Sequence, residues 1–165
     1  MKKPWNLINS PVYSVCTEYD GQLNLNICTY VSAVSMNPKQ YLVALDYNTL
    51  THKRVKEQGE FVLQLLSEKQ AALVRNLGQK SGKTFDKNGF LMRKQKTSDE
   101  NYVLQEWQNY RVLTHCVCTL KLQVVKAMAA ADHEMFLCNV LAYKVWKTEK
   151  PLTIDILRDQ KIVRM

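Results

Sequence analysis

The chain has 165 residues, 46% of them hydrophobic, and a formal net charge of +8 at pH 7. This length and composition exclude a disordered chain and predict a single domain over residues 1–165. The first residues lack the apolar segment of a secretory signal, and no apolar run approaches the ~20 residues that a membrane span needs.

The charge and the cysteines indicate the surroundings in which the protein works. A basic balance favours an anionic partner, and at this point nucleic acid, a membrane surface and a phosphorylated small molecule all remain open. The five cysteines are odd in number and contain no CxxC pair, which favours reduced thiols over disulfides or a zinc site. We therefore expect a cytoplasmic protein without a metal centre. We also expect no membrane partner, because no apolar run is long enough to span a bilayer.

A β-hairpin is predicted near the start of the chain. Two segments with strand character, 11–19 and 22–35, flank Asp20-Gly21, a dipeptide in which both positions tolerate positive φ. If the second strand is regular, its side chains alternate between an apolar face and a small polar face, the latter formed by Asn24, Asn26 and Cys28. Small polar residues let a flat ligand approach the backbone closely, although such a face more often meets solvent.

A short helix is predicted within DYNTLTHKRVKEQGEF, residues 46–61. We place its N-cap at Thr51 and its end at Gly59, with Leu50 and Val55 forming a hydrophobic staple around the start.

Three basic residues would fill the first turn of this helix, namely His52, Lys53 and Arg54. A cation at this end of the helix dipole costs roughly 0.3–1 kcal/mol, but it becomes favourable if an anion binds there beside the free backbone N–H groups. Hydroxyl groups on Thr49 and Thr51 would add donors, so a phosphate monoester suits the position. A solvated basic helix without a binding role is the simpler interpretation and stays open here.

The rest of the chain is predicted to form mainly β-strands. Ser67 to Gln70 fits a capping box and predicts a second helix that ends at Gly78. The polar, basic tract 78–102 is expected to be a loop that connects two halves of the domain. Further antiparallel strands are predicted at 41–47, 61–66, 110–128, 134–146 and 152–157. Many antiparallel strands with two short helices predict a small β-barrel or sandwich.

The order of these pieces resembles the flavin reductase-like family, the FMN-binding split barrels that include NAD(P)H:flavin reductases and flavoredoxins. The segments that carry the resemblance are, in chain order, NLNICTYVSAVSMNP, YLVALDYNTLTHKRV, GEFVLQLL and ADHEMFLCNVLAY. Each motif alone is only weakly specific for the family, whereas the order and spacing of the motifs over residues 10–146 are specific. The resemblance implies a mainly β fold: an antiparallel, Greek-key-like split β-barrel with two or more short helices.

The resemblance also implies a flavin site. The residues implied to bind the cofactor are Asn26, Ile27, Cys28, Thr29, Ser32, Thr49, Thr51, His52, Lys53 and Ser81. Residues 26–29 would meet the flavin ring or its ribityl chain, Ser32 would lie toward the phosphate, and the residues from Thr49 to Lys53 would hold the phosphate. His133 matches the histidine of the family's G-D-H element and would be the active-site contact with the flavin or the nicotinamide.

The implied function is that of an FMN-binding oxidoreductase, an NAD(P)H-dependent flavin reductase that works as a homodimer with the flavin at its interface. FAD is possible in place of FMN. The hydride chemistry belongs to the flavin, so no protein acid or base is required. Ala131, Gln64 and Cys138 depart from the family's usual glycine, asparagine and glycine, which leaves the substrate and the electron donor open.

Three alternatives remain beside this interpretation. A flavoredoxin-like protein would receive its electrons from a partner protein. A basic β-barrel that binds nucleic acid would need exposed aromatic residues between its Lys and Arg residues, and only Phe85 and Phe90 lie in the basic tract, so nucleic acid is disfavoured. A split barrel like pyridoxamine-phosphate oxidase typically has an Arg-rich phosphate site, which fits this sequence less well.

Overall fold

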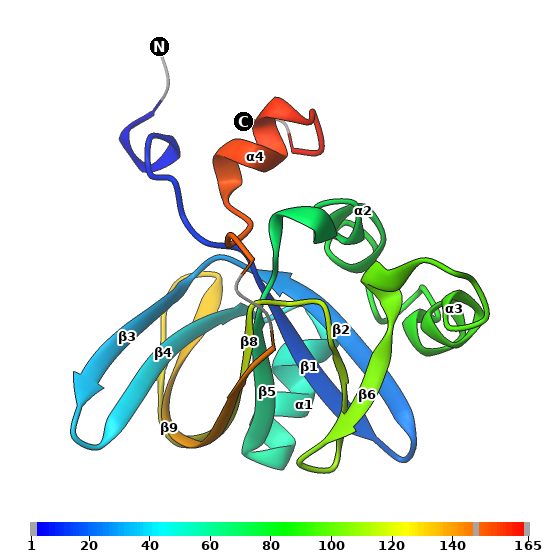
Figure 1. The fold of residues 1–165 in the computed structure, drawn as a ribbon. Helices are drawn as coiled ribbons and strands as arrows, with labels where there is room; N and C mark the ends of the chain where they lie inside the picture. The colour runs from blue at the N-terminus through cyan, green and yellow to red at the C-terminus, as the bar shows by residue number, and fades with distance from the viewer. Residues whose placement is uncertain (1–2, 147–148, 164–165) are drawn as a thin grey trace.

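The fold was analysed in a computed structural model that describes residues 3–146 and 149–163. One antiparallel sheet dominates it (Figure 1). Its strands are β1 (Tyr13–Tyr19), β2 (Gln22–Cys28), β3 (Val31–Met36), β4 (Lys39–Asp46), β5 (Glu60–Leu65), β8 (Cys118–Ala129) and β9 (His133–Val145). They are ordered β2-β1-β5-β8-β9-β4-β3, and a separate hairpin pairs β6 (Leu104–Trp107) with β7 (Tyr110–Leu113).

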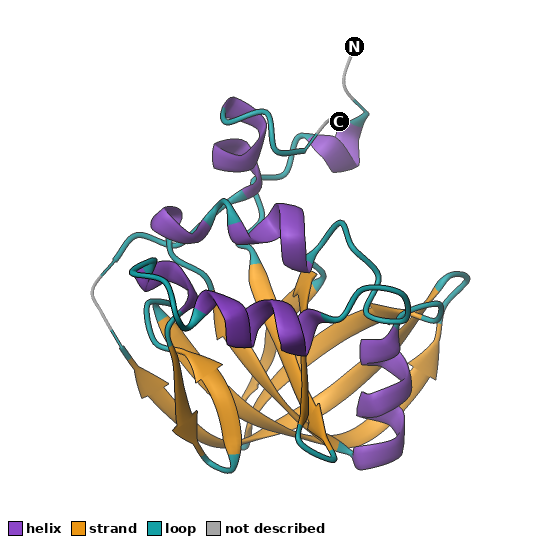
Figure 2. Ribbon diagram, turned by 90° about the vertical axis from the view of Figure 1, so that its right-hand side faces the viewer, coloured by secondary structure: helices purple, strands orange, loops and turns teal. Residues whose placement is uncertain are grey.

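Short helices cover the sheet. They are the α-helices α1 (Leu50–Gln58), α2 (Leu73–Leu77), α3 (Lys87–Lys94) and α4 (Ile154–Asp159), and the 3-10 helices η1 (Pro4–Asn6), η2 (Glu68–Gln70) and η3 (Glu100–Tyr102). Most of them gather over one end of the strands, while α1 stands along the side (Figure 2). Within the described part of the chain, no helix combines the length and the apolar character that crossing a membrane requires.

Both faces of β5 are buried, in two separate cores. Alternation along β5 sends Phe61 and Leu63 into the curl of the sheet, where Phe136 and Val55 of α1 also lie. It sends Val62 to the opposite face, where α2, α3 and α4 cover the sheet through Leu73, Leu77, Leu91 and Leu157. This double burial explains why β5 reads as an apolar run rather than as a clean alternation.

The predicted hairpin turn is confirmed. Asp20 and Gly21 have φ of 48° and 68°, and Tyr19 pairs with Gln22 across the turn. The following strand, expected to run from 22 to 35, is instead two strands, because the chain leaves β2 after Cys28 and begins β3 at Val31. That break carries the chain from one edge of the sheet to the other, so β2 and β3 form the two sides of the split.

The tract 78–102 is not a simple loop, because α3 and η3 form within it. The side chain of Asp86 accepts a hydrogen bond of 2.8 Å from the backbone N–H of Gly89 and caps α3, and Leu91 is fully buried. Aspartate is a common N-cap residue. The lysines and glycines around Asp86 nevertheless favoured the prediction of a loop. The long strand predicted at 110–128 is likewise divided into β7 and β8.

The strand predicted at 152–157 is wrong, because most of this segment forms α4. Leu152 keeps a strand-like contact, in which its carbonyl accepts from Val12 N at 2.9 Å. The spacing of the apolar residues after Leu152 is compatible with a strand and with a helix. Burial of Leu157 in the core under the helices selects the helix, which an ion pair of 2.6 Å between Arg158 and Asp155 supports.

Candidate functional site

Helix α1 begins two residues earlier than the sequence predicted. Thr49, not Thr51, is the N-cap: its hydroxyl accepts from the backbone N–H of His52 at 3.1 Å and donates to Asp46 O at 2.8 Å. Leu50 is therefore the first helical residue, and the staple predicted for it does not exist. A threonine at either position can cap a helix, and the turn after Asp46 decides between them. Gly59 ends the helix at φ 71°, as predicted.

The basic side chains of α1 turn to partners elsewhere. His52 is buried, with Nε2 2.6 Å from Glu134 Oε2. The Lys53 ammonium lies at the surface, 4.0 Å from Glu57 one turn later. Arg54 donates to the backbone carbonyl of Gln22 at 2.8 Å. The role of His52 and Lys53 in holding a phosphate stays a prediction.

Two adjoining cavities lie beside the start of α1. The first, of about 280 Å³, is enclosed by β2, the start of α1 and the connection from α2 to α3; its walls include Asn26, Thr49, Thr51, Gly78, Ser81, Gly82 and Lys87. The second, of about 360 Å³, runs along the end of β2 to the start of β9; its walls include Asn26, Ile27, Cys28, Thr29, Tyr30, Thr49, Gly78 and His133. Asn26, Thr49 and Gly78 line both, so we treat the two as one groove.

The groove brings together most of the residues that the sequence singled out for flavin binding. Those that line it are Asn26, Ile27, Cys28, Thr29, Thr49, Thr51, Ser81 and His133. Ser32, His52 and Lys53 are absent from the lining of these two cavities, as far as the described residues show. The role of each as a flavin contact stays a prediction.

Close approach of the α2–α3 connection to the sheet shapes one wall of the groove. A Cβ on Gly82 would lie 2.5 Å from Asn24 Oδ1, and a Cβ on Gly78 would lie 2.9 Å from Ile27 Cγ1. Asn24 is buried and donates to Thr51 Oγ1 at 2.9 Å. The two glycines therefore let the connection lie against β2, a role that the sequence alone did not reveal for Gly82.

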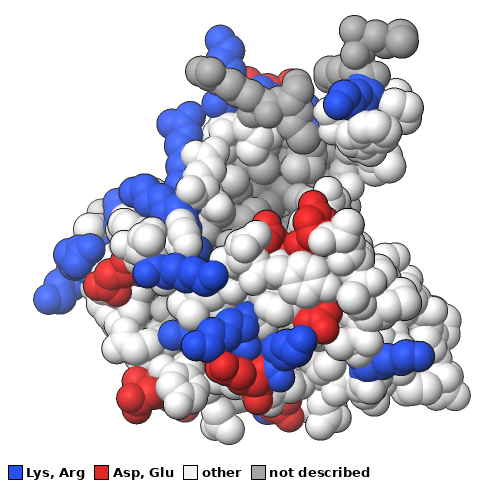
Figure 3. Space-filling view, turned by 180° about the vertical axis from the view of Figure 1, so that it is seen from behind, with Lys and Arg blue, Asp and Glu red and all other residues white. Residues whose placement is uncertain are grey.

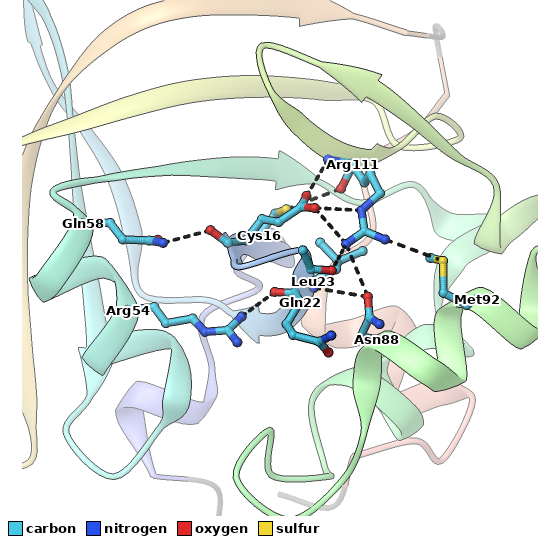
Figure 4. Close-up of polar contacts among 10 residues, drawn as sticks. Cys16, Gln22, Leu23, Arg54, Gln58, Asn88, Met92 and Arg111 are labelled. Atoms are coloured by element: carbon cyan, nitrogen blue, oxygen red, sulfur yellow. Dashed lines mark hydrogen bonds and ion pairs between the residues drawn. The ribbon is translucent and has the colours of Figure 1, made fainter.

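The connection leads into α3, which a network around Arg111 of β7 fixes to the β1–β2 hairpin (Figure 4). Arg111 Nε donates to Glu18 Oε1 at 2.9 Å, and Nη2 donates to Gly21 O at 2.7 Å. Arg111 Nη2 also reaches Asn88 Oδ1 on α3 at 3.3 Å, and Nη1 reaches Met92 Sδ at 3.6 Å. These bonds hold the first turn of α3 in place beside the groove.

His133 lies at the other end of the groove. It is the first residue of β9, its Nδ1 is 2.8 Å from Asp132 Oδ1, and its ring meets that of Tyr30 edge-on at 5.2 Å. The hydrogen bond to His133 is the main cause that lowers the pKa of the Asp132 carboxyl. Because Nδ1 is occupied by Asp132, Nε2 is the ring nitrogen that can serve a ligand.

The next residue of β9, Glu134, points the other way and binds α1. Its buried carboxylate is 2.6 Å from His52 Nε2 and 3.2 Å from Lys56 Nζ. The hydrogen bond from His52 is the largest cause that holds the pKa of Glu134 below its ordinary 4.5, with smaller effects from Lys56. These contacts fix α1 to the strand that carries His133.

We expect Glu134→Gln to reduce the stability of the protein in a pH-dependent way. Because the pKa of Glu134 is lowered in the folded state, its contribution is present above pH 4.5 and disappears as the pH falls through the lowered value. The variant should lose about 1–2 kcal/mol at pH 7, the worth of hydrogen bonds to a charged group. Urea unfolding at pH 7 and at pH 4 should show a smaller difference between the two pH values for the variant than for the wild type.

Glu57→Gln is the matched control, since this carboxylate is exposed on the same helix and only 4.0 Å from Lys53 at its closest. It should change the unfolding free energy little at either pH. Equal effects of the two substitutions would contradict a special role for Glu134.

Lys and Arg side chains gather around this region of the surface. In the view from behind, they cover the half that carries α3 and the connection before it, together with α1, while few lie over the β3–β4 hairpin (Figure 3). Lys53, Lys56, Lys80 and Lys83 are all exposed there. Such a distribution favours the approach of an anionic ligand.

The antiparallel sheet, open between β2 and β3 and capped by short helices, has the architecture of the FMN-binding split barrels. The sequence matches the flavin reductase like domain family over residues 5–156, and the chain belongs to this family. The family and the fold that the motif order implied are therefore confirmed, and they place the protein among the flavin-related oxidoreductases.

Solved structures share this fold at low sequence identity. The NADH:FAD oxidoreductase of Streptomyces globisporus C-1027, in complex with NAD and FAD fragments, is 16% identical with a TM-score of 0.76, covering 92% of this chain and 84% of that one. An FMN-binding protein of Thermus thermophilus with bound 1-cyclohex-2-enone is 17% identical with a TM-score of 0.75, covering 90% and 77%.

A third structure is the styrene monooxygenase flavin reductase of Pseudomonas putida S12, which is 17% identical with a TM-score of 0.74 and covers 92% of this chain and 90% of that one. At these identities the likeness shows the shared fold alone. A comparison with curated proteins found no match.

Proposed function

We propose that this protein is an FMN-binding oxidoreductase that acts as an NAD(P)H-dependent flavin reductase, with FAD as a possible alternative flavin. The observation that carries the proposal is the groove. It places the polar end of β2, the hydroxyl groups at the start of α1 and His133 side by side, although these residues lie far apart in the sequence. Membership of the flavin reductase like domain family supports the same ligand.

The two halves of the groove suit the two ends of a flavin nucleotide. The first half has hydroxyl groups on Thr49, Thr51 and Ser81 and lies at the N-terminal end of α1, so it suits a phosphate. The second half is lined by residues 26–29 and by His133, so it suits a flat ring. A bound flavin would supply the hydride chemistry, and these residues would bind and orient it.

We also propose a homodimer in the cytoplasm. The outer surface of β8 and β9 exposes large apolar side chains, among them Met128, Leu141, Tyr143 and Val145. An apolar hollow of about 170 Å³ lies on the same sheet, between Leu42, Met128, Met135 and Leu137. Exposed apolar surface of this kind is typical of protein interfaces, and a second copy of this chain is the partner that we propose for it.

An absorbance experiment tests the proposed function. The purified protein is incubated with FMN, the excess is removed, and NADH or NADPH is added without oxygen. We expect retained yellow colour that bleaches with one of the two nucleotides. His133→Ala should keep the colour and bleach roughly tenfold more slowly, about the loss of one hydrogen bond. His115→Ala is the matched control, since His115 does not line either of the two cavities, and it should change neither.

The outcomes separate the candidates. Colour that bleaches with dithionite but with neither nucleotide would favour a flavoredoxin-like protein that a partner reduces. Failure to bind FMN or FAD even at millimolar concentration would overturn the proposal. Light scattering on the same preparation reports whether the protein is a dimer.

A further inference from the structure

A third cavity adjoins the groove on the side of the last helix, and we call it the α4 cavity. It has a volume of about 240 Å³ and lies between the end of β2, α2 and α4. The apolar side chains that line it are Ile27, Val74, Ile154, Leu157 and Val163. An apolar cavity of about 150 Å³ can hold a benzene ring, so the α4 cavity has room for a larger, substituted ring.

The α4 cavity borders the half of the groove that suits the flavin ring. Ile27, Thr29 and Gly78 line both of them. A compound in the α4 cavity would be separated from a ring bound in that half of the groove by no more than these residues. Electrons can pass between two molecules over so short a gap, so the α4 cavity suits a second reactant.

The lining of the α4 cavity favours an uncharged ligand. Among the described residues that line it, none carries a charge, and the polar side chains are those of Thr29 and Gln79. The first half of the groove differs, because Lys80 and Lys87 line it. Moving an anion from water to a site without a counter-charge is unfavourable. The phosphates of a flavin or of a nicotinamide nucleotide therefore do not suit the α4 cavity, whereas a small apolar molecule does.

The two polar side chains of the α4 cavity have different roles. Gln79 Nε2 donates to Ile162 O at 2.8 Å and so ties the segment after α4 to the segment after α2. The backbone carbonyl of Thr29 accepts from Val31 N at 3.0 Å, but its hydroxyl has no hydrogen-bond partner within residues 3–146 and 149–163. A hydroxyl group can donate to a carbonyl oxygen. The site therefore suits an uncharged ring that carries a carbonyl group.

Helix α4 is held firmly where it borders the cavity, beyond the same end of the sheet as α2 (Figure 1). At its start, Ile154 N donates to Ser10 O at 3.0 Å. Nearer its end, Arg158 forms an ion pair of 2.6 Å with Asp155 and donates to Asn6 O at 2.6 Å. These bonds tie the helix to the N-terminal segment. The cavity is therefore part of the fold and not a gap beside a loosely attached helix.

We propose that the α4 cavity binds a small uncharged quinone, which accepts electrons by way of the flavin. The inference rests on the proposed function and deepens it by naming the class of the final electron acceptor. In the net reaction, the hydride of NAD(P)H supplies two electrons and one proton, and the solvent supplies a second proton. The two quinone carbonyls become hydroxyl groups, and the products are NAD(P)+ and a hydroquinone. A quinone suits the site because it is uncharged, offers a carbonyl oxygen to Thr29 and accepts electrons without direct contact with a hydride donor.

The test measures the binding of duroquinone, a quinone whose fully methylated ring leaves no position open to addition of a thiol. Calorimetric titration of the protein, first without flavin and then with FMN bound, gives its affinity. Ile154→Trp should fill the cavity and lower that affinity at least about tenfold, since apolar contact area is lost. It should leave the FMN affinity and the bleaching by NAD(P)H unchanged. Ile156→Trp is the matched control and should change none of these, because Ile156 is a partly buried residue of the same helix that does not line the cavity.

Each other outcome has a distinct meaning. If the wild type does not bind duroquinone, or if Ile154→Trp binds it equally well, the inference is overturned while the proposed function stands, because FMN binding and bleaching are measured separately. If Ile154→Trp loses FMN together with duroquinone, the cavity belongs to the flavin site and the inference is overturned. If the wild type binds neither FMN nor FAD, the proposed function fails and electron transfer to the quinone fails with it. Val163→Trp, a second substitution in the lining, should act as Ile154→Trp does and decides the question if that variant does not fold.

Discussion

Replacing Phe61 by alanine should lower the free energy of unfolding by about 3–5 kcal/mol, the range for deletion of a buried aromatic side chain. Phe61 lies on β5, is fully buried and pairs with Leu122 of β8 in the core inside the sheet. Deleting its ring leaves a cavity that the surrounding strands cannot fill, because their hydrogen bonds hold them in register. Domains of this kind have about 5–15 kcal/mol of stability in total, so the variant should be close to unfolding at 25 °C.

Urea denaturation followed by circular dichroism measures this effect. Phe61→Leu keeps most of the volume and should cost only about 1 kcal/mol. Tyr19→Ala removes an aromatic ring that is 63% exposed at the end of β1, and should change stability by less than about 0.5 kcal/mol. A cost for Phe61→Ala no larger than that for Tyr19→Ala would contradict a core centred on this side chain.

The second large effect concerns the wall of the groove. Gly82→Ala would place a Cβ 2.5 Å from Asn24 Oδ1, and the buried Asn24 side chain cannot move without losing its hydrogen bond to Thr51. We expect the α2–α3 connection to shift instead, at a cost of about 1–3 kcal/mol in stability. Because Ser81 and Gly82 line the first half of the groove, FMN affinity should fall by about tenfold or more, equivalent to at least ~1.4 kcal/mol.

Gly59→Ala is the matched control for this substitution. Gly59 has φ 71° and open space around its missing Cβ, so alanine should cost about 1–2 kcal/mol in backbone strain and leave FMN affinity unchanged. Calorimetric titration with FMN and urea unfolding of both variants separate the two effects. Similar losses of FMN affinity in both variants would show that general destabilisation, not the wall of the groove, controls binding.

Local signals in the sequence were sufficient for several elements. Asp20-Gly21 predicted its hairpin because both positions tolerate positive φ, and Gly59 predicted a helix end for the same reason. The capping box was also visible, and Gln70 Oε1 accepts from Ser67 N at 3.1 Å, but it begins the short 3-10 helix η2, and the single helix predicted from it to Gly78 is divided into η2 and α2. The order of motifs along the chain predicted the family and the split barrel, because that order follows the order of the strands.

Helix starts and short apolar segments were less predictable. Thr49 and Thr51 are both good caps, and a turn held by Asp46 chose the first. The apolar residues after Leu152 alternate as a strand would, yet their contact with the core under the helices selects α4. In both cases the sequence allows two local structures of similar free energy, and packing decides between them.

The sequence by itself determined the class of fold, the places of several strands and a set of residues most of which line the groove. Only the tertiary structure decided which cations line the groove, namely Lys80 and Lys87. His52 is drawn away by Glu134, 82 residues later in the chain, while Lys87 is brought to the groove by a carbonyl 62 residues earlier. The physical reason is that a backbone propensity acts over a few neighbouring residues, whereas the partner of a charged side chain depends on which strands and helices meet in space.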